Sequence, residues 1–566
     1  MTFIRSTVLV SSIAIAFACT VFPSSALAQS SANTVTDRKE QTKLLQQYAS
    51  QAQAALHAKD YLRAAEQYEK AYSIDPRISD ISYNAACAYA LAGKTDLAFA
   101  WLEKSFKAGY FNLEHIKKDS DLDALHADAR WAKYLDRIQA QVKRDAKLWN
   151  SEVWKSPYAE QLSEDQRIAG LSKLWSEVKY NFIYTDILKE LDWDAVYAKF
   201  LPRVKAATNT LEYYKILMEM GAMLKDGHTG VYPPDPLYAT DFTVPPFRTR
   251  LIEGKVIITE VVDESLRKQG ILPGVEIARI NQEPVKEWAF KNTAPYASAS
   301  TPQDLESRVF IYQFLIGNKA DKPQIELRDA AGKTWSVEIE RVSFGQRNQA
   351  FGKLPAFSWK LLPGNIAYVA LNSFGDDTAA QEYMKNFAEI SKAKAIIFDV
   401  RKNGGGNGSV GYKVLATLTD KDFATSRAET RDYKPSYRAW GRQETNFVFD
   451  TYSESPNPNI QFKGQVIVLT SAQTYSAAED FTVAFDTMKR GTIMGEATGG
   501  STGQPLMFDL PGGGSARVCT KKDSYADGKP FVGVGVQPNI VVRPKLADFR
   551  ADRDTVLEAA LAQIKP

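Results

Sequence analysis

The sequence predicts a multidomain α/β protein built from N-terminal helical repeats, a second helical segment, a small β domain and a C-terminal α/β domain. The chain has 566 residues, which at roughly 100 to 200 residues per domain corresponds to three to five domains. Apolar residues recur at helical spacing from about residue 40 to 108 and again from 160 to 225, and short strands follow from 245 to 345. After about residue 360, strands alternate with helices.

The composition is that of a soluble globular protein. Hydrophobic residues make up 44% and charged residues 24%, which excludes wholesale disorder and a polytopic membrane protein. Lysine and arginine number 70 against 67 acidic residues, a formal charge of +3. So small a charge on so long a chain provides no basic field, so we expect no nucleic-acid partner.

Residues 1–28 are typical of a cleavable export signal. Arg5 supplies a positive start, an apolar run follows from Val8, and residues 26–28 (Ala-Leu-Ala) match a small-x-small cleavage site. The run is too short for a comfortable membrane span. A lipoprotein signal cleaved before Cys19 is the weaker alternative, because the residues before that cysteine fit poorly. We expect cleavage after Ala28, a periplasmic or secreted protein, and no membrane span in the mature chain.

Residues 38–145 are expected to form helical repeats. The period is 34: Ala64 matches Ala98, and Glu69 matches Glu103. This resembles tetratricopeptide repeats, which have that period. The alternative is a pair of ordinary helical hairpins whose register is accidental. The resemblance implies a concave surface for a protein docking partner.

Residues 156–235 form the second predicted helical segment. Ile168, Leu171 and Leu174 have helical spacing, and the last helix, at about 211–225, stops at a polar turn. His228 then lies on a loop. Loops held by rigid elements often carry function, so His228 is a candidate, with a structural histidine as the alternative.

Residues 245–345 predict a small β domain with strands near 256–258, 276–281, 325–327 and 337–339. The stretch 270–277 (Gly-Ile-Leu-Pro-Gly-Val-Glu-Ile) resembles the core of a PDZ domain, a module that takes up peptide ends by strand addition. Val275 stands where that family usually has Asp. The alternative is an unrelated β domain.

Residues 351–546 predict the α/β domain, with buried strands at 366–371, 395–400 and 465–470. Two motifs in it fit their usual context poorly. Gly499 to Gly503 is a literal G-x-S-x-G around Ser501, but a strand-like stretch follows where a nucleophile elbow needs a helix. Gly406 to Gly411 is a literal G-x-G-x-x-G without the second strand of a nucleotide site, so its glycines are better suited to exposing N–H groups to an anion.

Ser476 is the third candidate, between a predicted strand and a predicted helix at about 477–489. Ser476 with Glu479 three residues later fits a capping box, in which the two side chains satisfy free N–H groups of the helix start. The functional alternative is a nucleophile at the positive end of the helix.

Cysteine and histidine residues give no sign of a metal site. Cys87 and Cys519, which remain after signal removal, are far apart and in apolar surroundings, so buried thiols are expected, although export would permit one bridge. The four histidines include no metal-ligand pattern.

Five segments in the order typical of one family resemble peptidase family S41, the tail-specific or C-terminal processing proteases. They are 224–229 (LKDGHT), 398–406 (FDVRKNGGG), 474–479 (TYSAAE), 495–500 (GEATGG) and 533–540 (GVGVQPNI). The resemblance covers roughly residues 160–545 and implies a crotonase-like α/β core that cleaves proteins through a serine.

The resemblance also implies the site residues. One branch of the family uses a lysine 25 residues after its serine, and that position here is Ser501, so the dyad lysine is missing. The other branch, similar to the core of tricorn protease, uses histidine. It implies Ser476 as nucleophile, His228 as general base, and an oxyanion hole from the N–H groups of Ala477 and of Gly404 or Gly405.

Two positions depart from the histidine branch. That branch tends to carry a glutamate just before its Gly-x-Gly-x-x-Pro segment, whereas Val532 precedes Gly533 here. The alternatives for the group that orients His228 are water or one of Asp523, Asp527, Glu479 and Glu496. Gly227 stands where tricorn protease has a second serine.

The sequence therefore predicts an exported serine endopeptidase acting on proteins or peptides, with docking repeats, a PDZ-like module that positions or gates substrate, and no required cofactor. One alternative is a catalytically inactive scaffold that binds proteins through its repeat and PDZ-like modules. Another is a carrier of hydrophobic ligands, since the retinoid-binding protein of the retina shares this core.

Overall fold

The computed structural model describes residues 40–449 and 453–564, apart from Thr42 and Gln46. It divides into two compact units, Met1–Ser151 and Glu152–Pro566. The predicted signal, residues 1–28, lies outside the described residues. Among the residues that are described, no helix is both long enough and apolar enough to cross a membrane.

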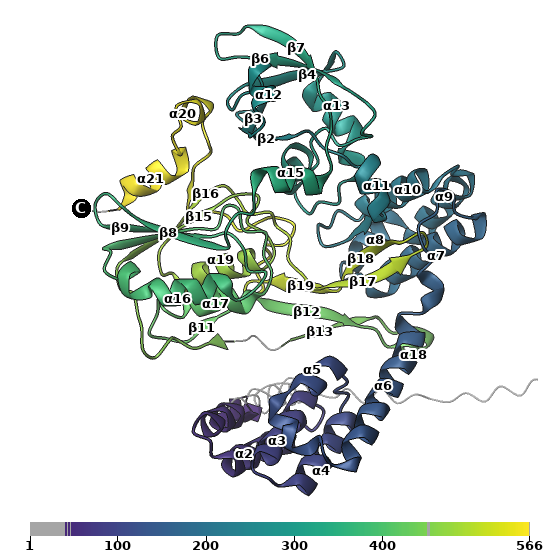
Figure 1. Cartoon of the computed structure of the whole chain (residues 1–566), viewed down its shortest axis with the longest axis vertical. Coiled ribbons are helices and arrows are strands. Elements are labelled where there is room, and N and C mark those ends of the chain that lie inside the picture. Colours follow the sequence, from purple (N-terminus) through teal and green to yellow (C-terminus); the bar gives the residue numbers. More distant parts are fainter. Residues whose placement is uncertain (1–39, 42, 46, 450–452, 565–566) are drawn as a thin grey trace, which may run out of the picture. The chain divides into compact units, whose positions relative to one another are not determined.

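The first unit is helical (Figure 1). Its elements are α2 (Tyr61–Ile74), α3 (Ser79–Leu91), α4 (Thr95–Lys107), α5 (Leu113–Lys118), the 3-10 turn η1 (Ser120–Leu125) and α6 (Ala129–Trp149). Helices α2 and α4 begin 34 residues apart, and both pack against α3. Ala64 and Ala98 are fully buried at equivalent places, where a methyl group allows close helix packing. The tetratricopeptide assignment itself stays a prediction.

The second unit begins with a helical layer that a distant hairpin completes. Its elements are α7 (Glu164–Asn181), α8 (Thr185–Leu191), α9 (Trp193–Ala206), α10 (Thr210–Ala222), β1 (Gly230–Tyr232), β17 (Pro505–Leu510) and β18 (Gly514–Cys519). The strands form a sheet in the order β1-β18-β17. Tyr214 on α10 donates its hydroxyl to the Pro511 carbonyl at 2.7 Å and accepts from the Gly514 N–H at 3.0 Å. The hairpin, predicted within residues 351–546, thus shares the core of the helical layer.

A small antiparallel sheet follows, as the alternating strands predict. It contains β2 (Phe247–Ile252), β3 (Lys255–Val261), β4 (Glu276–Ile280), β6 (Gln324–Arg328) and β7 (Thr334–Glu338) in that order, with β5 (Glu283–Pro284) paired to β4. Helix α13 (Val285–Asn292) contributes Val285 and Ala289 to its core.

The α/β domain is built on a six-stranded sheet in the order β20-β16-β15-β10-β9-β8. The strands are β8 (Phe357–Leu362), β9 (Ile366–Leu371), β10 (Ala395–Asp399), β15 (Gln465–Thr470), β16 (Thr492–Gly495) and β20 (Ile540–Val541). All neighbouring strands pair in parallel except β8 with β9. Apolar residues of β10 alternate, so Ile396 and Phe398 face one layer while Ala395 and Ile397 face the other.

Helices cover both faces of this sheet (Figure 1). One face packs against α16 (Thr378–Ile390), α17 (Gly408–Leu415) and α19 (Ala477–Met488), and the other against α21 (Thr555–Gln563). In addition, β12 (Arg427–Asp432) lies between β13 (Thr445–Val448) and β19 (Lys521–Ser524). Strand β15, an inner strand, ends shortly before the turn that carries Ser476, so the carboxyl end of this strand helps to position that residue.

Candidate active site

Ser476 lies in a sharp turn between strand β15 and helix α19. Its backbone has φ 54° and ψ −128°, a region that residues other than glycine rarely occupy and that is often found where strain serves a function. The turn is held in place because the Tyr475 N–H donates to the Asn403 carbonyl and the Ser476 N–H to the Ser501 carbonyl, both at 3.0 Å. The surrounding fold therefore holds the serine in a strained conformation.

The capping-box interpretation of Ser476 is wrong. The Ser476 side chain makes no capping hydrogen bond to α19. The Glu479 carboxylate instead turns away from the helix start and accepts from the Thr498 hydroxyl, the Gly500 N–H and the Ser501 N–H, at 2.5, 2.7 and 2.8 Å. The hydroxyl of Ser476 is thus not engaged in satisfying its own helix.

His228 follows α10 in the turn that leads into β1, and it is 5% exposed. Its Nε2 lies 3.1 Å from the Ser476 Oγ, and its Nδ1 lies 2.8 Å from the Ser501 Oγ. The ring also stacks on that of Tyr475, with centroids 5.3 Å apart and planes 9° from parallel. The two ring nitrogens and one ring face are therefore all in contact with the segments around Ser476 and Ser501.

The surroundings of His228 favour the neutral imidazole. The pKa of His228 is lowered to about 3, mainly by burial and then by the positive charges of Arg517, Arg308 and Lys521, in that order. Two of these cations are fixed close by, since Arg308 and Arg517 both donate to the carbonyl of Gly227, at 3.2 and 2.9 Å. A neutral ring with one N–H directed at Ser501 leaves Nε2 free to accept a proton from Ser476.

None of the four acids considered from the sequence hydrogen-bonds to His228 in the described part of the chain. Glu479 holds backbone and hydroxyl donors, and Glu496 pairs with Arg250. Asp523 pairs with Lys521 at 2.9 Å, and Asp527 is exposed on a turn. The Ser501 hydroxyl contacts the His228 Nδ1 instead. The sequence had pointed to Ser501 only as a possible nucleophile and as the position where one branch of the family has its lysine. The one available signal was its position 25 residues after Ser476.

Glu479 supports the site indirectly. The residue is fully buried, and burial raises the pKa of Glu479 to about 8 against the opposing effect of its three donors. Because it binds the N–H groups of Gly500 and Ser501, it fixes the backbone that presents the Ser501 hydroxyl to His228.

The glycine loop that follows β10 approaches Ser476 closely. Gly405 has φ +96°, and a Cβ there would lie 2.6 Å from the Ser476 Cβ and 2.9 Å from the Ala477 nitrogen, so only glycine fits. The Gly405 N–H donates to the Asn403 Oδ1 at 2.9 Å, so it is occupied in this conformation, and the oxyanion role expected of Gly404 or Gly405 stays a prediction. Among the described residues, the N–H groups of Gly404 and Ala477 have no acceptor, and these two remain as candidates.

Gly227 is explained by its neighbours. A Cβ at this position would lie 1.8 Å from the Tyr475 hydroxyl and 2.8 Å from a terminal nitrogen of Arg308. That hydroxyl accepts from Arg308 at 2.9 Å. Tyr475 and Arg308 therefore occupy the space that a second serine would need.

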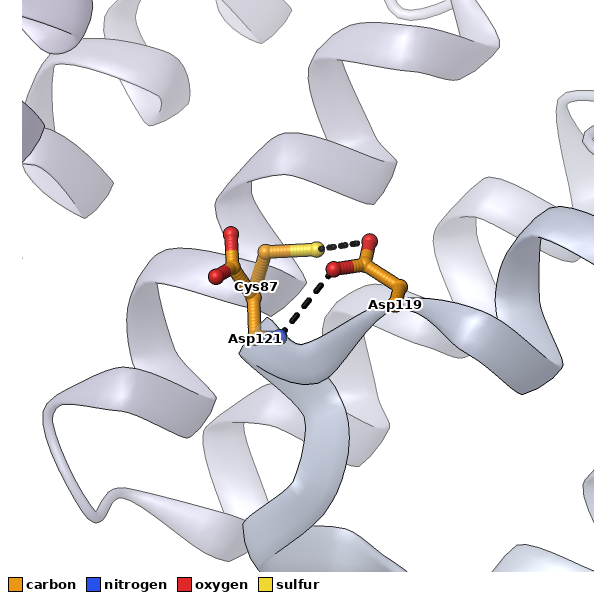
Figure 2. Close-up of side chains that lie close together, drawn as sticks. All are labelled: Cys87, Asp119 and Asp121. Carbon is orange, nitrogen blue, oxygen red and sulfur yellow. Dashed lines mark hydrogen bonds between the residues drawn. The ribbon is translucent and has the colours of Figure 1, made fainter.

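A further cluster of potential ligands lies in the helical-repeat unit (Figure 2). Cys87, Asp119 and Asp121 place one ligand atom each within 4.8 Å of one another. The Cys87 thiol donates to Asp119 at 3.6 Å, as does the Tyr83 hydroxyl at 2.7 Å, and the Asp121 N–H occupies the other oxygen of Asp119 at 3.1 Å. Burial raises the pKa of the Cys87 thiol, so the thiol stays protonated and donates to Asp119. The hydrogen bonds to Asp119 connect α3 with η1, which accounts for the cluster. Cys87 and Cys519 are both free, buried thiols.

Two family models match the segments that carry Ser476 and the helices before His228. Residues 365–542 match peptidase family S41, and residues 171–222 match the tricorn protease C1 domain. A chloroplastic C-terminal processing peptidase of Tetradesmus obliquus is 27% identical over 213 residues, which cover 37% of this chain and 42% of that protein. The tail-specific protease of Haemophilus influenzae is 24% identical over 359 residues, which cover 60% and 47%. The chain thus spans less than half the length of these relatives.

Solved structures show the same fold. Mature CPAF complexed with lactacystin aligns with a TM-score of 0.56 at 14% identity, covering 69% of this chain and 95% of that chain. A CPAF mutant aligns with a TM-score of 0.57 at 15% identity, covering 69% and 94%. The sequence matches thus identify a peptidase family S41 domain at residues 365–542 and a tricorn protease C1 domain at residues 171–222.

Proposed function

We propose that this protein is a serine endopeptidase that cleaves proteins or peptides through an acyl-enzyme on Ser476, with His228 as general base. The observation that carries the proposal is the 3.1 Å contact between the Ser476 Oγ and the His228 Nε2, made by a serine held in a strained turn. The names of the relatives, C-terminal processing peptidase and tail-specific protease, agree with polypeptide substrates.

The reaction uses only groups of the chain and water, so it needs no cofactor. Nε2 of His228 takes the proton of Ser476 as Oγ bonds to the substrate carbonyl carbon. The oxyanion is stabilised by the N–H groups of Gly404 and Ala477. Nε2 then returns the proton to the leaving amine, and water hydrolyses the acyl-enzyme by the same steps. The Ser501 hydroxyl accepts a hydrogen bond from the Nδ1–H throughout, which favours the tautomer that leaves Nε2 unprotonated.

The remaining modules are assigned by the sequence resemblances. Residues 38–145 dock a protein partner as tetratricopeptide-like repeats, and residues 245–345 position substrate as a PDZ-like module in which β2 and β7 form the sheet edges. The core at 351–546 is crotonase-like. Residues 1–28 direct export to the periplasm or the outside and are removed after Ala28.

Active-site labelling tests the proposal. A fluorophosphonate is added to the protein lacking residues 1–28 and to Ser476→Ala and His228→Ala, and casein degradation is measured in parallel. Labelling and cleavage in the parent, with both lost in each variant, support a histidine-assisted serine. Labelling lost only in Ser476→Ala would place the base elsewhere. A parent that neither labels nor cleaves would favour the inactive scaffold.

A further inference from the structure

A cavity of about 360 Å³ opens beside the catalytic segments of the second unit. Its walls include Tyr412 of α17, Ser426, Glu454, Asp480 of α19, and Lys521 and Asp523 of β19. The size is that of a ligand pocket, and its walls bring three carboxyl groups together with a single lysine.

Two of these walls, Asp480 and Tyr412, continue segments already placed at the active site. Asp480 lies on α19 four residues after Ser476, which precedes the first residue of that helix, so about one turn or 6 Å separates them along its axis. The Thr502 hydroxyl, directly after Ser501, lies 3.3 Å from the Asp480 Oδ2. Tyr412 belongs to the helix that begins just after the glycine loop. The cavity therefore shares helix α19 and, through Thr502, the Ser501 segment with the candidate active site.

The charges inside the cavity are incompletely balanced. Asp480 accepts from the Ser426 hydroxyl at 2.8 Å, and Lys521 pairs with the Asp523 Oδ1 at 2.9 Å. Among the residues that the structure describes, the Asp523 Oδ2 has no hydrogen-bond partner, and it is buried because Asp523 is only 2% exposed. Burial and the neighbouring Asp480 raise the pKa of Asp523 to about 7. A buried acceptor without a donor costs roughly 1–3 kcal/mol, and a bound cation would remove that cost.

We propose that this cavity binds the side chain of a substrate lysine or arginine adjacent to the scissile bond, with Asp523 and Asp480 as the acidic groups that recognise it. The proposal rests on the proposed peptidase function. The methylene groups of the guest would lie against the ring of Tyr412, and its charged end would reach the free oxygen of Asp523. Glu454 adds a third carboxyl group to the walls, which contain one ammonium group, that of Lys521.

The proposal is tested by mapping cleavage sites in unfolded casein by mass spectrometry. We expect Lys and Arg to be enriched at one fixed position next to the cleaved bond. Two quenched peptides that differ only by lysine or norleucine there should give a kcat/KM ratio of about 10 or more. Asp523→Asn should lower this ratio about tenfold, whereas Asp527→Asn, an exposed aspartate of the following turn, should leave it unchanged.

Fluorophosphonate labelling of every variant separates the possible outcomes. If Asp523→Asn fails to label, Glu454→Gln takes its place and should lower the same ratio. Cleavage without a basic preference, or a preference unchanged in these variants, overturns the pocket and leaves the peptidase proposal standing. If the parent neither labels nor cleaves, the peptidase proposal fails, and titration with agmatine decides the pocket. Binding weakened by Asp523→Asn would retain a cation site, and no binding would overturn it.

Discussion

The substitution Ser501→Ala tests the arrangement of the proposed site most directly. It removes the 2.8 Å partner of the His228 Nδ1 and leaves a buried N–H without an acceptor while the ring must carry a charge. A hydrogen bond to a charged group contributes about 1.5–3 kcal/mol, and each 1.36 kcal/mol changes a rate about tenfold. We therefore expect kcat to fall about 10- to 150-fold. KM should change little, because Ser501 is not in the proposed substrate cavity.

The assay is steady-state cleavage of a quenched peptide, with the rate of fluorophosphonate labelling as a second measurement. The backbone N–H of residue 501 still binds Glu479 in the variant, so the loop should stay in place. Ser82→Ala is the matched control, because Ser82, like Ser501, is a buried serine. Its hydroxyl donates to the Ser79 carbonyl at 2.9 Å and lies in the helical-repeat unit. A kcat for Ser501→Ala within twofold of the parent would refute the role of Ser501.

Three further predictions concern pH, the glycine loop and the core. Since the pKa of His228 is lowered to about 3, the neutral base persists as the pH falls, so kcat/KM at pH 5.5 should stay near its neutral value; an acid limb near 6.5 would contradict this. Gly405→Ala should abolish activity because its Cβ overlaps the nucleophile, whereas Gly404→Ala keeps its N–H, meets no atom within 4 Å and should cleave normally; equal activities would contradict the loop geometry. Tyr214→Phe removes a hydroxyl that bridges two backbone groups and should lower the free energy of unfolding by about 1–3 kcal/mol in urea titration; an unchanged midpoint would contradict it.

The sheet of the α/β domain could be predicted from the sequence because its strands are buried on both faces. Continuous apolar runs place strands at 366–371, 395–400 and 465–470, and the structure has strands at Ile366–Leu371, Ala395–Asp399 and Gln465–Thr470. The packing of residues 505–519 on the helical layer was not predictable in this way. It depends on contacts such as that of Tyr214 with Gly514, which are 300 residues apart and leave no local pattern.

The site could be predicted only in part for a similar reason. Ser476 and His228 lie in recognisable motifs, although 248 residues separate them. Ser501 was missed because reasoning from the family sought a charged partner, and an uncharged hydroxyl gives no comparable signal. Glu479 was considered as an orienting acid, but its carboxylate acts on backbone N–H groups instead. Such a role depends on side-chain direction, which spacing does not determine.

The absence of a carboxylate at Nδ1 leads to a final prediction, Ser501→Asp. A negative charge within about 4–6 Å of an imidazole raises its pKa by about 1–3 units, so the acid limb of kcat/KM should move to higher pH by that amount. The buried Glu479 opposes the substitution, because two carboxyl groups then share one environment, and labelling must first show that the variant retains its site. In a variant that labels, an unchanged acid limb would mean that residue 501 does not face Nδ1. A raised acid limb would show that residue 501 faces Nδ1 and that a negative charge there offsets part of the burial and cationic effects that lower the pKa of His228.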